Sequence, residues 1–157
     1  MSYYVGFGAK VIIREEFRFL IENYFDFEGS TDPILAAFDK LIDYESFKNY
    51  ICYDEYSFDR ESGLWDFKCE YNMNPGLEPF YAMNRFEKCL LPYITQEYLE
   101  ASNFDEEEPA WKYYDQSFIE GMNSNLKDRE KLIQFIHTEL KDTDSYKEWK
   151  EHGCCFI

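Results

Sequence analysis

Two stretches of the chain alternate apolar and other residues with the period of a β-strand. In residues 3–11 every second side chain is apolar, and the residues between them include two glycines. Residues 64–71 repeat the pattern, with Trp65, Phe67 and Cys69 on one face and charged residues on the other. This period is typical of a strand with one buried face. The glycines indicate a bulge or another segment packed closely against the first strand.

A short turn precedes the second of these stretches. Residues 59–63 run from Asp59 to Gly63, and both residue types are common in turns. The preceding residues 50–58 are rich in aromatic side chains, and their period is ambiguous. We expect residues 50–58 and 64–71 to pair as an antiparallel hairpin.

Apolar residues spaced three and four apart predict helices in most of the remaining chain. One such stripe begins at Phe17 and continues to residue 25, and two glutamates in its first turn suit the positive end of the helix dipole. Residues 30–33 combine a capping residue with a proline and predict a helix that continues to residue 42. Further helices are expected at residues 80–90 with a restart at Pro92, at 109–121, at 126–140 and at 145–153.

The segments between these helices carry stop and start signals. Residues 102–108 are expected to form an acidic loop, and Gly121 is expected to end the helix that follows it. Asn125 is expected to cap the helix at residues 126–140, whose apolar side chains face inward. The apolar residues 154–157 are expected to dock as a strand or a plug.

Together these elements predict an α+β fold, in which a small antiparallel sheet of about three strands is covered by about five or six α-helices. The chain has 157 residues, and no internal repeat or linker divides it, so residues 1–157 are expected to form a single compact domain. Apolar types make up 45% and aromatics 20% of the residues, which excludes an intrinsically disordered chain.

The first residues and the cysteines predict a cytoplasmic protein. Residues 1–5 lack the basic stretch and apolar core of a secretory signal peptide. The longest aliphatic run, residues 11–13, is far shorter than the roughly 20 residues that cross a bilayer. Five cysteines are an odd number and include no C-x-x-C pair, so we expect buried reduced thiols and no disulfide framework.

Motifs of the common enzyme classes are absent from the sequence. It contains no G-x-x-x-x-G-K-[ST] phosphate loop, no G-x-S-x-G elbow and no H-E-x-x-H helix. His137 has charged neighbours on its expected helix, which favours a solvated position over that of a catalytic base. His152 lies near Cys154 and Cys155, but adjacent cysteines do not easily bind one tetrahedral ion. We therefore predict a protein that is not an enzyme and has no metal or cofactor.

The net charge changes this picture most. The chain has 32 acidic and 16 basic residues, a formal net charge of -16. Nucleic-acid binding by bulk charge is excluded, as is a polybasic membrane-surface protein, because both need Lys and Arg opposite phosphates. Residues 1–111 contain 23 of the acids and only 9 of the bases, and no base lies between Lys88 and Lys112.

Two interpretations of this charge remain open. The carboxylates either keep an aromatic-rich fold soluble or form a surface that meets a positive partner. Tyrosines beside the acids favour the second, because Tyr provides much contact area with few rotatable bonds. The leading hypothesis is a non-enzymatic acidic interaction module that binds and blocks a basic, nucleic-acid-binding surface of a partner protein such as a nuclease. Nuclease-immunity proteins and phage antagonists of host defence are comparable in charge and size. The expected binding residues are Asp54, Glu55, Tyr56, Asp59, Glu61, Glu97, Glu100, Asp105, Glu106, Glu107 and Glu108.

Two other classes of function stay as alternatives. One is a self-associating structural or accessory protein that buries exposed aromatic side chains in a homo-oligomer. The other is a small enzyme with an unrecognised site, for which we expect a pocket lined by convergent polar groups with shifted pKa values.

Overall fold

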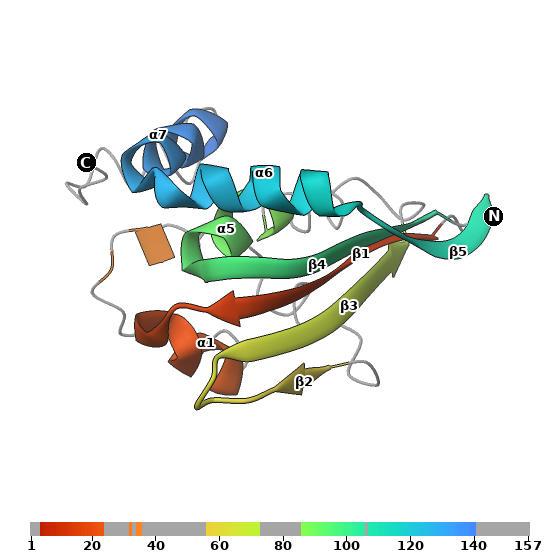
Figure 1. The fold of residues 1–157 in the computed structure, drawn as a ribbon, viewed down its shortest axis with the longest axis horizontal. Coiled ribbons are helices and arrows are strands. Elements are labelled where there is room, and N and C mark those ends of the chain that lie inside the picture. The colour runs from red at the N-terminus through yellow and green to blue at the C-terminus, as the bar shows by residue number, and fades with distance from the viewer. Residues whose placement is uncertain are drawn as a thin grey trace.

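The computed structural model describes residues 4–23, 32, 34–35, 56–72, 86–105 and 107–140. In this part of the chain, five strands form one antiparallel sheet with the order β2-β3-β1-β4-β5 (Figure 1). The strands are β1 (Tyr4–Ile13), β2 (Ser57–Phe58), β3 (Leu64–Asn72), β4 (Thr95–Asp105) and β5 (Glu108–Tyr113). The helical elements are the 3-10 turn η1 (Glu15–Phe17), α1 (Arg18–Glu22), the π-helical turn η3 (Phe86–Leu90), α5 (Leu91–Ile94), α6 (Gln116–Lys127) and α7 (Arg129–Leu140).

The central strand β1 separates two faces of different character. It pairs with β3 on one side and β4 on the other, and its register places Val11 opposite Trp65. Both side chains are buried, whereas the next residue of β3, Asp66, is exposed. The alternation predicted for residues 3–11 and 64–71 is therefore confirmed for residues 5–11 and 64–70, whose side chains the structure describes. We call the face that carries Asp66 the outer face of the sheet.

The two glycines of β1 allow neighbouring segments to approach closely, as predicted. A Cβ atom on Gly6 would lie 2.3 Å from the carbonyl oxygen of Cys69 and 3.2 Å from the Trp111 ring. The irregularities of pairing fall elsewhere, between β1 and β4, beside Lys10 and Ile12. The glycines thus mark close packing and not a bulge.

The predicted hairpin is confirmed over the residues that the structure describes. β2 pairs antiparallel with β3, and residues 59–63 form the turn between them, while residues 50–55 lie outside the described part. The Arg18 guanidinium holds this turn by donating to the carbonyl oxygens of Ile13, Arg60, Glu61 and Ser62, at distances of 2.9 to 3.3 Å.

Helical elements cover the face of the sheet opposite the outer face and bury one continuous core. The rings of Trp65 and Phe67 stack with centroids 3.9 Å apart, and Phe86 of η3 meets Phe67 edge-on. Figure 1 shows α6 lying along β4, with α7 beside it. These two helices add Ile119 and Ile136 to the core.

The apolar stripes predicted for the first and last described helices are confirmed by burial. The buried side chains of the first stripe are Phe17, in the 3-10 turn η1, and Leu20 and Ile21, in the following helix α1. In α7, Leu132 and Ile136 face the core as predicted.

The helix start predicted at residues 30–33 has its capping residue at Asp32. The Asp32 carboxylate accepts hydrogen bonds from the backbone N–H groups of Ile34 and Leu35, at 2.9 and 3.1 Å. The other three residues of that start signal lie outside the described residues, as does most of the expected helix.

The acidic loop predicted at residues 102–108 and the helix predicted from residue 109 are wrong. Thr95–Asp105 forms β4 and Glu108–Tyr113 forms β5. The pairing with β1 shifts register after Lys10, so the buried residues Tyr98 and Ala101 are three positions apart. A bulge therefore hides the period of two by which a strand is recognised in sequence.

The boundaries predicted for α6 and α7 are also wrong. Asp115 caps α6 by accepting the N–H of Phe118 at 2.9 Å, and the helix continues through Gly121. Asn125 lies inside α6, and Asp128 begins the next helix by accepting the N–H of Lys131 at 3.1 Å. Gly in an exposed helix interior costs only about 1 kcal/mol, which the packing of α6 against β4 offsets.

The fold is α+β as predicted, but the expected three strands and five or six helices are wrong. Across the described ranges the sheet has five strands, and there are four α-helices: α1, α5, α6 and α7. The two added strands come from the segment that was expected to be loop and helix. The helix expected at residues 145–153 and the tail at 154–157 lie outside the described residues.

No described helix is long and apolar enough to span a membrane. Cys69 and Cys89 are buried, as predicted, and the other three cysteines lie outside the described residues.

Two glycine substitutions test this local geometry. Gly63 has a φ of +77°, and an added Cβ would lie 2.5 Å from the Arg18 side chain, so Gly63→Ala should lower the free energy of unfolding by about 1–3 kcal/mol. An added Cβ on Gly121 meets no atom within 4 Å. Gly121→Ala should therefore raise the free energy of unfolding by about 0.5–1 kcal/mol. Urea unfolding measures both changes, and equal effects of the two substitutions would contradict the turn geometry.

Candidate functional site

The acidic residues predicted to bind a partner fall into three separate places. Asp59 and Glu61 lie in the β2–β3 turn, Glu97 and Glu100 lie on β4, and Asp105 and Glu107 lie at the β4–β5 turn. Asp54, Glu55 and Glu106 lie outside the described residues, and Glu108 begins β5.

The two turns are at opposite ends of the sheet. Val5 of β1 pairs with Asp105, whereas Ile13, at the other end of β1, donates its N–H to the carbonyl of Gly63. Eight residues of extended strand separate these points, a distance of about 26 Å. Among the residues that the structure describes, the predicted acids therefore do not form one cluster.

Two of the predicted residues have clear structural roles. The half-buried Tyr56 donates its hydroxyl to the carbonyl of Ile21 at 3.0 Å and packs edge-on against the Trp65 ring. The Asp59 carboxylate accepts the Ser62 hydroxyl at 2.7 Å, and this hydrogen bond keeps the pKa of Asp59 below its usual range. Both side chains support the hairpin and its contact with α1.

The outer face of the sheet carries four exposed carboxylates along its length. Glu97 and Glu100 of β4 lie on this face, and so do Asp66 and Glu70 of β3. Lys10 of β1 stands between the two strands, opposite both Asp66 and Glu100. We call Asp66, Glu70, Glu97 and Glu100 the outer-face acids.

Asp66 and Glu70 were missed as binding candidates, although the sequence contained a signal for them. The polar side of the alternation in residues 64–71 placed both on one exposed face. Their proximity to Glu97 and Glu100 followed only from the strand order, in which β1 lies between β3 and β4.

The described arginines are engaged away from the outer-face acids. Arg14 pairs with Glu16 at 2.9 Å, and Arg60 pairs with Glu22. Arg18 is committed to the carbonyl oxygens of the β2–β3 turn.

Two partly buried cations, Arg129 and Lys68, lie against aromatic rings. Arg129 donates to the carbonyl of Tyr93 at 2.8 Å, and its guanidinium lies 4.7 Å from the centroid of that ring. The Lys68 ammonium lies 5.0 Å from the centroid of the Trp111 ring, at the N-terminal end of β1. In the part of the chain that is described, none of the outer-face acids forms an ion pair.

Aromatic side chains occupy one end of the outer face. The rings of Phe104 and Trp111 have centroids 5.5 Å apart, and the Trp111 ring lies against Gly6 of β1. Tyr113, the next outward residue of β5, is 57% exposed. This end of the face therefore offers apolar contact area beside the carboxylates.

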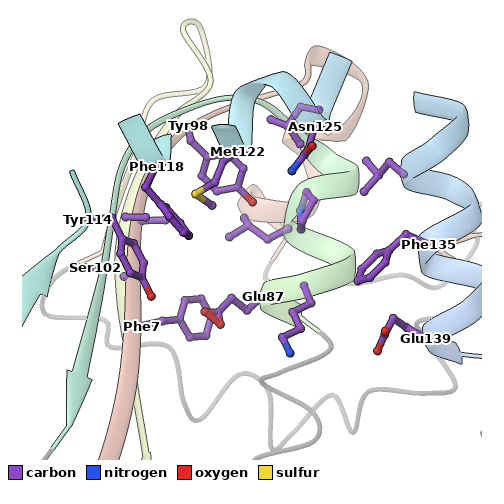
Figure 2. Close-up of a pocket in the computed structure, with 18 of the residues that line it drawn as sticks. Phe7, Glu87, Tyr98, Ser102, Tyr114, Phe118, Met122, Asn125, Phe135 and Glu139 are labelled. Atoms are coloured by element: carbon purple, nitrogen blue, oxygen red, sulfur yellow. The ribbon is translucent and has the colours of Figure 1, made fainter. Parts of the chain in front are cut away.

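A cavity of about 630 Å³ lies on the helix-covered side of the sheet. Its walls come from β1 and β4, from η3 and α5, and from α6 and α7. The side chains that line it are mainly apolar, among them Phe7, Tyr98, Phe118, Met122 and Phe135 (Figure 2). Such a volume lies within the range of small-molecule pockets.

One carboxyl group points into this cavity. Glu87 of η3 is half-buried, and Figure 2 shows its side chain extending from the helix toward the sheet. Burial raises the pKa of the Glu87 carboxyl, and the neighbouring Lys88 offsets part of this shift. Burial and the charge of Glu87 both raise the pKa of the buried Tyr98 phenol, so Tyr98 stays neutral at physiological pH.

Neither the sequence motifs nor the charge pattern pointed to this cavity, because its lining residues come from six elements. Within the described ranges, no three His, Cys, Asp or Glu side chains are grouped as metal ligands. His137, which was expected to be solvated, is half-buried on α7.

Comparison with known proteins reveals no relative. No protein-family model, no curated protein and no solved structure matches the chain.

The pKa of Glu87 predicts a specific dependence of stability on pH. A carboxyl whose pKa is raised by folding destabilises the protein as the pH rises above the unfolded value near 4.5, because ionisation then opposes burial. Glu87→Gln should therefore gain stability relative to the wild type as the pH rises from about 4 to 8.

Urea unfolding at several pH values measures this difference. Glu120→Gln, at an exposed position of α6, removes the same charge and serves as the control. A Glu87→Gln profile parallel to that of Glu120→Gln would contradict the desolvation of Glu87.

Proposed function

We propose that this protein is a non-enzymatic acidic interaction module that binds and blocks a basic, nucleic-acid-binding surface of a partner protein. The outer-face acids form the centre of this binding surface. The observation that supports it is their exposure without an ion pair to any described residue, although Lys10 and Lys68 lie on the same face of the sheet.

The geometry of the sheet supports this use of the carboxylates. Asp66 and Glu100 lie on strands separated by β1, so their backbones are about 10 Å apart. The hydrogen-bonded sheet fixes the backbone from which these carboxylates project. Exposed charges with this spacing act mainly on the association rate and on the choice of partner.

The aromatic end of the outer face supports the apolar part of the contact. Tyr113 and Trp111 lie where a partner that covers the carboxylates would also cover apolar surface. Tyr and Trp are frequent anchors of protein interfaces. Because the chain carries a net charge of -16, the partner is a basic protein and not a nucleic acid.

The proposed location of this activity is the cytoplasm. The odd number of cysteines and the burial of Cys69 and Cys89 support reduced thiols and hence a reducing compartment.

Two charge-matched variants test the proposed surface. The first replaces the outer-face acids by amides: Asp66→Asn, Glu70→Gln, Glu97→Gln and Glu100→Gln. The second replaces four exposed acids of helical elements elsewhere: Glu15→Gln, Glu120→Gln, Glu130→Gln and Glu139→Gln. Both variants lose four negative charges, so they differ only in where the charge is removed.

Binding is measured by biolayer interferometry against a panel of purified basic nucleases, with protamine as a generic polycation. For a nuclease that binds, the first variant should lose at least about tenfold in affinity at 50 mM salt, and the second less than about twofold. Duplex DNA should compete, and salt should weaken wild-type binding. Equal losses in both variants would overturn the proposed surface, and failure to bind any of the nucleases would overturn the proposed function.

A further inference from the structure

The cavity between the sheet and the helices offers a second site, on the side opposite the outer-face acids. Its lining contains aromatic side chains that remain accessible to solvent: Tyr114 is 38%, Phe118 is 51% and Phe135 is 42% exposed. The rings of Tyr114 and Phe118 stack with centroids 4.4 Å apart, and both residues are labelled at the same wall in Figure 2. These rings form a preordered apolar wall.

Glu87 is the half-buried charged residue of the cavity lining, which also contains the polar residues Ser102 and Asn125. Its carboxyl is half-buried among apolar walls, whereas Lys88, Lys131 and Glu139 are exposed at the cavity. A carboxylate that loses water without gaining a partner costs free energy, and a bound cation recovers that cost. The exposed lysines gain no such benefit from a bound anion, because water already solvates them.

We propose that this cavity binds a small organic cation with an apolar body, such as an alkylammonium ion. The ammonium group meets the Glu87 carboxylate, and the apolar body lies against Phe118, Met122 and Phe135. Aromatic faces attract cations through their quadrupoles, so Phe7, Tyr98 and Tyr114 add to the recognition of the charged group.

The volume and the net charge are consistent with this class of ligand. About 630 Å³ accommodates a drug-sized molecule and is small for a folded domain. The excess of carboxylates on the whole chain raises the local concentration of cations around it.

Three probes with the same eight-carbon tail separate the contribution of the charge from that of the apolar body. Octyltrimethylammonium carries a cation, octanoate an anion and 1-octanol no charge. Isothermal titration calorimetry should show that octyltrimethylammonium binds at least about tenfold more tightly than octanoate, with 1-octanol between them. Chemical-shift changes of the Tyr98 and Tyr114 rings locate the bound probe.

Variants of the lining assign the effect to named groups. Glu87→Gln should lower the affinity for the cation about tenfold and leave that for 1-octanol unchanged, and Glu87→Asp should keep the preference for the cation. Phe118→Ala should weaken all three probes. Glu120→Gln, which removes an exposed charge outside the cavity, should change none of them.

Several outcomes would overturn this assignment. If octanoate binds more tightly than octyltrimethylammonium, the lysines select the ligand. If all three probes bind equally, Glu87 does not discriminate between charged and neutral ligands. A doubled mass in sedimentation that Phe118→Ala reverses would identify a second copy of the chain as the occupant. The variant lacking the outer-face acids should bind octyltrimethylammonium within about twofold of the wild type, which separates this test from that of the proposed function.

Discussion

The double pairing of β1 is the constraint on which the rest of the structure depends. Because β3 and β4 bond to its two edges, each side chain of β1 must point either into the aromatic core or onto the outer face. Gly6 makes this arrangement possible at its N-terminal end, where the Cys69 carbonyl and the Trp111 ring leave no room for a side chain. The same pairing brings the acids of β3 and β4 onto one surface, although about 30 residues separate them in sequence.

Two of the arginines hold local structure together inside the fold. Arg18 binds the carbonyl oxygens of a turn, and Arg129 binds a carbonyl and the Tyr93 ring. Burial lowers the pKa of Arg129. These contacts stabilise local structure, while the net charge of -16 comes from the excess of carboxylates in the sequence.

The two candidate sites lie on opposite sides of one sheet, and different interactions govern binding at each of them. The outer face is flat, exposed and charged, so its interactions are long-ranged and weakened by salt. The cavity is apolar and concave, and it holds a carboxyl whose pKa is raised by burial. A ligand there gains from removing apolar surface from water, a short-ranged effect that salt does not screen. Occupation of one site therefore does not require the other, and both follow from covering a sheet with helices on a single face.

Local patterns in the sequence determined the α+β class, the strands at β1 and β3, the turn between β2 and β3, and the inward stripes of α1 and α7. Each of these depends on residues within a few positions of one another, where alternation, capping and turn preferences act directly. The strands β4 and β5 depended on pairing with a distant partner, and the bulge opposite Lys10 removed their alternation. The dispersal of the predicted acids, the grouping of the outer-face acids and the cavity at Glu87 were likewise decided by the tertiary structure alone. The reason is that strand order and helix packing join segments far apart in the chain, and no local spacing records which segments will meet.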